Sequence, residues 1–174
     1  MNGRVPIDRT RRAALGSLLA LACVVLGTPG CATGTHRPSP RGRSAIEEVH
    51  LFGVPVALHL DGRPVPDAVG VRVYASNNGR AHGLPIAKGR LEIVMFDGVF
   101  DPPATPVPKP LKIWSFGPRE LVPFAAETSL GTGYQLALRW GNDRPTGTAV
   151  TVLARYTTPD GTAFESSTTS IPLK

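Results

Sequence analysis

The chain has 174 residues, with 19 lysines and arginines against 13 aspartates and glutamates, and a formal net charge of +6. Residues 1–30 hold four of the basic residues and one of the acidic ones, so the remainder carries only +3. The remaining basic residues are scattered, and no aromatic residues are interleaved with them. The charge therefore does not indicate a nucleic-acid partner.

The first thirty residues have the three-part plan of an export signal: a basic start, an apolar middle and a small-residue end. The uncharged stretch 13–27 has fifteen residues. At about 1.5 Å per helical residue it is shorter than the roughly 30 Å hydrocarbon core of a bilayer. Pro29 and Gly30 then interrupt any helix just before Cys31. The pattern predicts a cleaved signal peptide over residues 1–30.

The end of this segment resembles the signal of bacterial lipoproteins, in which a small residue precedes a cysteine that is acylated through its sulfur. Gly30 and Cys31 carry the match. The segment "TRRAAL" at 10–15 also resembles a twin-arginine export signal. The resemblance implies a palmitate-type lipid on Cys31 and attachment to a membrane of the cell envelope, with the protein facing the periplasm or the exterior.

Cysteine usage supports the same hypothesis independently. The chain has two cysteines, Cys23 and Cys31, and cleavage after residue 30 would remove the first of them. The mature chain could then form no internal disulfide, and a modified sulfur at the cleavage point would explain both the position and the number of cysteines. Cleavage without lipid and an uncleaved anchor are the alternatives.

Residues 31–44 follow as a segment rich in Thr, Pro, Gly, Ser and Arg. Such a composition cannot bury enough apolar surface to offset the entropy lost on ordering, so we expect a lipid-anchored flexible tether. Its basic residues could contact acidic lipid or an anionic polysaccharide, and a solvated linker is the simpler alternative.

Residues 45–174 are expected to form one domain made of strands. Several segments are rich in β-branched and aromatic residues, and some alternate apolar with polar positions. The sequence predicts an all-β fold, a single antiparallel β-sandwich of about seven strands with immunoglobulin-like or related topology. The expected strands are 54–60, 69–75, 90–96, 111–116, 134–140, 149–156 and 163–171.

Turn residues separate these strands. The segment "TTPDGT" between the last two strands predicts a hairpin, and "DGRP" at 61–64 and "GNDRPTG" at 141–147 predict turns. Only 117–124 looks helical, because Pro118 could start a helix and Pro123 would stop it after about one turn.

Alternation predicts which side chains form the core. The expected inward residues lie on three strands: Val69, Val71, Val73; Tyr134, Leu136, Leu138, Trp140; and Val150, Val152, Ala154, Tyr156. The expected outward residues are Arg72, Gln135, Arg139, Thr151 and Arg155. The segment 130–136 also resembles the tyrosine corner of Greek-key sandwiches through Tyr134.

No residue pattern indicates catalysis, a cofactor or a metal. The four histidines lack metal-ligand spacing, and no nucleophile elbow, phosphate loop or zinc-protease motif occurs. His59, next to Asp61 and Arg63, is interpreted as the end of a strand entering a turn. Glu92 and Asp97 could form a carboxylate pair, and a strand residue plus a turn residue is the simpler interpretation. We therefore expect no enzyme.

Two functions remain from the sequence. The first is an envelope-anchored structural or protein-interaction module, and the alternative is a small carbohydrate-binding module that uses loop aromatics. Trp114 and Trp140 are the candidate ligand contacts for an unidentified envelope protein or polysaccharide, although core positions explain them more simply. The proline-rich segment 97–114 is either a crossover or a recognition loop. The chain as a whole is similar to uncharacterised exported lipoproteins of planctomycete-type bacteria.

Overall fold

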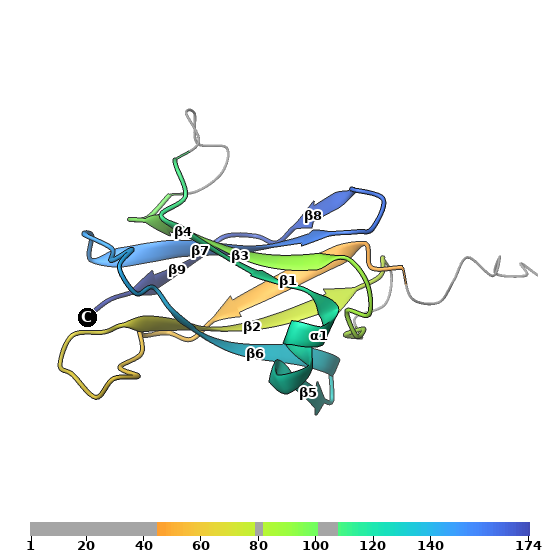
Figure 1. Ribbon diagram of the computed structural model, residues 1–174, viewed down its shortest axis with the longest axis horizontal. Coiled ribbons are helices and arrows are strands. Elements are labelled where there is room, and N and C mark those ends of the chain that lie inside the picture. The colour runs from red at the N-terminus through yellow and green to blue at the C-terminus, as the bar shows by residue number, and fades with distance from the viewer. Residues whose placement is uncertain (1–44, 79–81, 101–107) are drawn as a thin grey trace, which may run out of the picture. The chain divides into compact units, whose positions relative to one another are not determined.

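The computed structural model describes residues 45–78, 82–100 and 108–174, and these residues form two antiparallel sheets packed face to face (Figure 1). One sheet has four strands in the order β1 (Glu48–Gly53), β2 (Ala68–Ser76), β6 (Gly131–Arg139) and β5 (Ala125–Thr128). The other has five strands: β4 (Lys112–Phe116), β3 (Arg90–Asp97), β7 (Ala149–Thr157), β8 (Ala163–Glu165) and β9 (Thr169–Pro172), with β8 and β9 both paired to β7.

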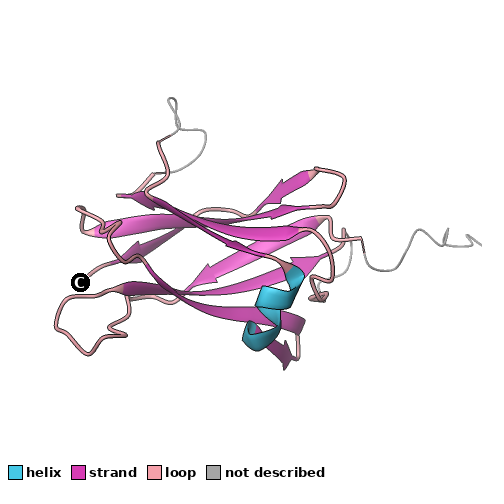
Figure 2. Cartoon of the chain, in the orientation of Figure 1, coloured by secondary structure: helices cyan, strands magenta, loops and turns pink. Residues whose placement is uncertain are grey.

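The order of the strands is that of the immunoglobulin fold. Lettered along the chain, with β8 and β9 together as strand G, the sheets are A-B-E-D and C′-C-F-G. The helical turn expected at 117–124 is present as α1 (Pro118–Leu121) followed by the 3₁₀ turn η1 (Val122–Phe124) (Figure 2). The expected all-β sandwich and the expected β7–β8 hairpin are confirmed.

The core lies between the sheets and is built by alternation. Eleven residues were expected to point inward, and all of them are buried. They lie on β2, β6 and β7, apart from Trp140, which directly follows β6. Leu91, Ile93 and Met95 of β3 complete this layer from the second sheet. Removing this apolar surface from water is the main favourable contribution to folding, at roughly 25 cal/mol per Å².

The prediction of a strand at residues 54–60 is wrong. Residues 54–60 form a loop in which only Leu58 makes a bridge, to Ala68, and the chain pairs with β2 earlier, along β1. Pro55 has no N–H to donate to a ladder, and Val54 and Val56 are exposed. In β1, by contrast, Val49 and Leu51 are buried in the core. His59 is therefore a loop residue and not the end of a strand.

The last expected strand is divided in two, and β5 was not predicted at all. Between β8 and β9, Ser166 takes over a ladder position: its Oγ accepts a hydrogen bond of 3.0 Å from the backbone N–H of Ala154. A side chain that replaces a backbone partner ends the regular pairing there. β5 has the sequence "AAET", which has little strand propensity, and its pairing with β6 decides its conformation.

Thr151 was expected to face solvent, and this is wrong because the chain covers it. Thr151 lies on the outer face of β7, where its Oγ1 donates to the Gly98 carbonyl at 2.8 Å and accepts from the Phe100 N–H at 3.3 Å. The segment after β3 thus folds back over the sheet, and Phe100 packs on Phe96 in a small second apolar cluster.

Two buried tyrosines hold the connection from β2 to β3. Tyr134, on the strand equivalent to E, accepts a hydrogen bond of 2.7 Å from the Ile86 N–H, and Tyr156 donates one of 3.1 Å to the Lys88 carbonyl. Burial raises the pKa of both phenols, so both hydroxyls keep their protons. Tyr134 does bond to the backbone, but its partner lies 48 residues upstream. It is therefore not a tyrosine corner, in which the partner lies only a few residues away.

Candidate functional site

One end of the sandwich carries the loops that form the candidate site. The loop 54–67 between β1 and β2, the loop 140–148 between β6 and β7, and the end of the chain meet there, because Ala57 N–H bonds to the Pro172 carbonyl and Leu173 N–H to the Thr148 carbonyl. The chain enters the first strand at the opposite end (Figure 1). We call the loop-bearing end the distal pole.

The two tryptophans expected as possible ligand contacts both lie near this pole. Trp140 is 3% exposed and belongs to the core, so its ring is almost wholly covered. Trp114, on β4, is half-buried; its Nε1–H donates to the Arg139 carbonyl at 3.0 Å, and the Lys112 ammonium lies 5.8 Å from its ring centroid. Neither residue is an exposed stacking platform.

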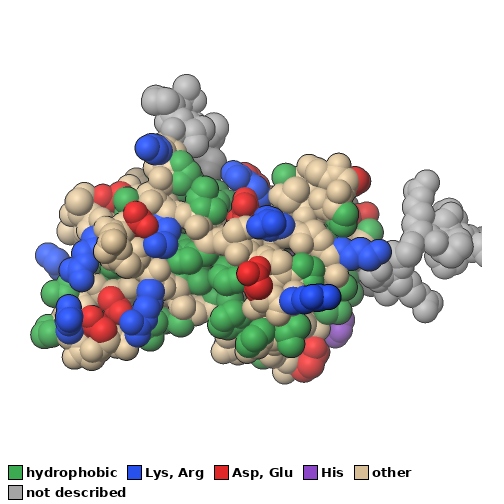
Figure 3. All heavy atoms as spheres, viewed as in Figure 1, with side chains coloured by type: hydrophobic (Ala, Val, Ile, Leu, Met, Phe, Trp, Pro, Cys, Tyr) green, Lys and Arg blue, Asp and Glu red, His purple; other side chains and the backbone are tan. Residues whose placement is uncertain are grey.

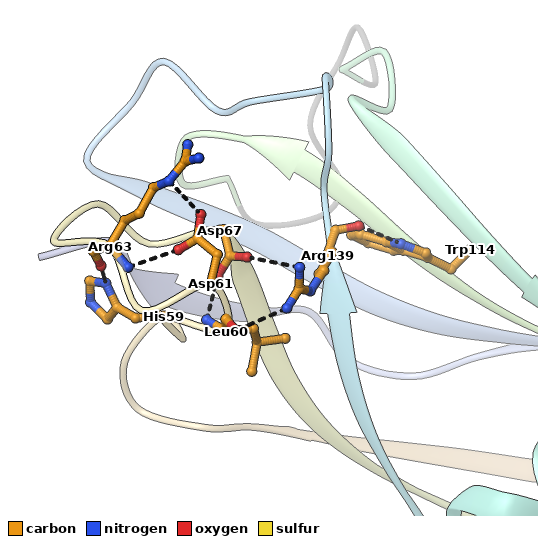
Figure 4. Close-up of polar contacts among 7 residues, drawn as sticks. All are labelled: His59, Leu60, Asp61, Arg63, Asp67, Trp114 and Arg139. Atoms are coloured by element: carbon orange, nitrogen blue, oxygen red, sulfur yellow. Dashed lines mark hydrogen bonds and ion pairs between the residues drawn. The ribbon is translucent and has the colours of Figure 1, made fainter.

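Arg139, at the end of β6, fixes the loop 54–67 (Figure 4). Its guanidinium donates to the Leu60 carbonyl at 2.9 Å and lies 3.7 Å from a carboxylate oxygen of Asp67. The other Asp67 oxygen accepts the Leu60 N–H at 2.6 Å. Hydrogen bonds to charged groups are stronger than neutral ones, so this network holds the loop in one conformation.

A second set of contacts closes the tip of the same loop (Figure 4). Asp61 accepts the Arg63 N–H at 3.0 Å and lies 3.4 Å from the Arg63 Nε. His59 Nδ1 lies 2.8 Å from the Arg63 carbonyl oxygen, which can only accept, so Nδ1 carries the proton. These residues shape a turn, and none of them is placed as a nucleophile beside a base.

Between the two loops lies a groove with a volume of about 680 Å³, which we call the distal groove. Its apolar walls come from valines and prolines of the loop 54–67, from Pro145 and from Trp140. The ionisable residues among those that line it are His59, Arg144 and Lys174, and all three are basic. At this end of the molecule, acidic side chains lie among lysines and arginines (Figure 3).

Asp97 and Lys112 fix the second wall of the groove. The Asp97 carboxylate accepts the Oγ1–H and the N–H of Thr146 and the N–H of Gly147. Lys112 donates to the Trp140 carbonyl at 2.7 Å and to Asp143 at 2.9 Å. The hydrogen bond from the Thr146 hydroxyl, followed by the two backbone N–H groups, lowers the pKa of Asp97.

Asp97→Asn is expected to lower the free energy of unfolding at pH 7 by about 1 kcal/mol or less, because Asp97 is exposed to solvent. A lowered folded-state pKa gives stability that is present above the unfolded pKa and lost as the pH falls through the folded one. Urea unfolding at several pH values should show the gap between wild type and variant closing on acidification. A gap that persists in acid would contradict the role of the carboxylate charge.

Glu92 and Asp97 do not form the carboxylate pair that was the less simple of the two interpretations. Glu92 lies 3.7 Å from Arg155 on the outer face of the five-stranded sheet, whereas Asp97 binds the loop 140–148. Within the described residues, no three His, Cys, Asp or Glu side chains are grouped to hold a metal. In the same part of the chain, no helix has the length and apolarity needed to cross a membrane.

A second groove, of about 690 Å³, lies on the outer face of the four-stranded sheet. Phe52 and Leu130, which line it, are 56% and 53% exposed. Gly70 and Ala137 also line it, and the Val54 side chain packs directly over Gly70, where an added Cβ would lie 2.7 Å from Val54 Cγ2. We call this the outer groove; its lining also includes Val54, Leu58, Arg72 and Gln135.

Sequence reasoning missed both grooves. The distal groove combines loops about eighty residues apart, and the only local signal was that both predicted turns contain an Arg-Pro pair, at 63–64 and 144–145. Cys31, the candidate lipidation site, lies outside the described residues. Comparisons with protein-family models, with curated proteins and with solved structures found no match.

Proposed function

We propose that this chain is a lipid-anchored protein of the cell envelope whose β-sandwich is a protein-interaction module without catalytic activity. The anchoring part rests on the signal-like residues 1–30 and on Cys31. The sandwich is a suitable module because its loops and faces are displayed on a rigid core.

The outer groove carries the proposal of a protein partner. Exposed apolar side chains scattered singly need no explanation, but here Phe52, Val54 and Leu130 surround one hollow on one face. Aromatic and aliphatic side chains around a pocket are typical of the centre of a protein interface. The partner would bury this surface.

The carbohydrate alternative has less support. Sugar rings stack on exposed aromatic faces, so a coplanar pair of exposed tryptophans would favour this function. Trp140 is buried, and Trp114 uses its indole N–H to bind Arg139. These positions favour the protein-interaction proposal over the carbohydrate one.

Cys31→Ser is expected to release the protein from the membrane fraction or to leave it as an unprocessed precursor, because serine offers no thioether for the acyl group. Cys23→Ser should have no effect, since that sulfur is discarded with the signal. Metabolic labelling with a radioactive fatty acid should mark the wild type and Cys23→Ser but not Cys31→Ser. An unlabelled, soluble wild type that begins beyond Cys31 would refute the anchor.

The partner itself is tested by placing a photo-crosslinking amino acid at Phe52 in cells. Ile113 provides the matched control, because it is an apolar residue, 48% exposed, on the edge strand of the other sheet. We expect a defined protein adduct from position 52 and none from position 113. Adducts of equal yield at both positions would show that the outer groove is not a specific interface.

A further inference from the structure

We propose that the distal groove binds a small amphiphilic carboxylate, with the apolar part of the ligand between its valine and proline walls and the carboxylate at Arg144. This site lies outside the outer groove, and it depends neither on the lipid anchor nor on the protein partner.

The size and the lining of the groove suit such a ligand. Its volume of about 680 Å³ falls within the roughly 300–1,000 Å³ typical of small-molecule sites. Val56, Val65, Pro64, Pro66 and Pro145 line it, and Val56 and Val65 are largely exposed. Proline side chains have little conformational freedom to lose, so such walls bind apolar surface at a small entropic cost.

The charge around the groove selects an anion. The described acidic residues of the distal pole are all engaged in contacts that hold its loops: Asp61 with Arg63, Asp67 with Arg139, Asp97 with the backbone at 146–147, and Asp143 with Lys112. None of these carboxylates lines the groove.

Arg144 differs from Arg63, Lys112 and Arg139, which are all paired. Arg144 and Lys174 both line the groove, and neither forms an ion pair with any of the residues that the structure describes. A guanidinium presents a planar set of donors that matches a carboxylate in a bidentate pair. Arg144 can therefore bind a ligand without first breaking an ion pair within the described part of the chain.

The groove is formed before any ligand binds. Arg139 holds the loop 54–67 through Leu60 and Asp67, and Lys112 and Asp97 hold the loop 140–148 from the other sheet. Walls fixed by charge-assisted hydrogen bonds need no ordering on binding, and this saves the free energy that a mobile site would lose.

The test compares three probes with the same apolar body, 4-phenylbutanoate, 4-phenylbutanol and 4-phenylbutylamine, by calorimetric titration of the purified full chain. The carboxylate should bind most tightly and the amine least. Arg144→Gln should weaken binding of the carboxylate about tenfold or more and leave binding of the alcohol unchanged. Arg72→Gln makes the same change of charge in the outer groove and should have no effect.

A second variant tests the apolar wall. Val65→Glu places a negative charge at an exposed position of the groove and should abolish binding of 4-phenylbutanoate while the melting temperature stays the same. The proposal is overturned if the carboxylate does not bind, if all three probes bind equally, or if Arg72→Gln rather than Arg144→Gln removes binding.

Discussion

Gly89→Ala is expected to lower the free energy of unfolding of the sandwich by more than about 3 kcal/mol, which corresponds to a fall in melting temperature of roughly 10 °C. Gly89 has a φ of +76°, where a side chain costs about 1–2 kcal/mol. A Cβ there would also overlap the Thr157 carbonyl oxygen and lie 2.9 Å from the Tyr156 hydroxyl oxygen. Thr157 pairs with Arg90 at the start of the β3–β7 ladder, so this backbone cannot move aside without breaking the pairing.

Gly62→Ala is the matched control. Gly62 has nearly the same φ, +73°, but a Cβ there would meet no atom within 4 Å. This variant should therefore show only the cost of placing a side chain at positive φ, a loss of about 1–2 kcal/mol. Urea unfolding of both variants separates the two contributions. Equal losses at the two glycines would mean that the contact with Thr157 is relieved at little cost.

The central strands were predictable because alternation is a local property that burial on one face preserves. Val71, Leu136 and Val152 each lie in a nine-residue strand whose inward positions are apolar, except for Thr132 near the start of β6. The error at 54–60 shows the limit of the method. This segment is more apolar than β1, and apolarity alone therefore favoured it as a strand. Pro55, however, has no backbone N–H to donate to a neighbouring strand.

The distal pole could not be predicted, because its contacts join residues far apart in the sequence. Arg139 was correctly expected to face outward, yet its contact with the Leu60 carbonyl spans 79 residues. The prediction that Thr151 faces solvent was wrong for a related reason. Alternation shows on which face of the sheet a side chain lies, but not whether another segment of the chain covers that face. The turn residues at 61–64 and 141–147 indicated loops without indicating that these loops meet.

Ile93→Ala is expected to lower the free energy of unfolding by about 2–5 kcal/mol, because the side chain is fully buried at the centre of the sandwich. Ile93 lies on β3 opposite Trp114 on one neighbour and Ala154 on the other. Truncation removes apolar contacts and leaves a cavity that these paired strands cannot close without moving the ladder.

Ile113→Ala makes the same chemical change on the adjacent strand and provides the control. Ile113 lies opposite Val94 on the outer face and is 48% exposed, so its truncation should cost less than about 1 kcal/mol. Urea unfolding of the two variants tests the assignment of faces along β3 and β4 directly. If Ile113→Ala were the more damaging, the register of this strand pair would be shifted by one residue, since such a shift exchanges the inward and outward faces.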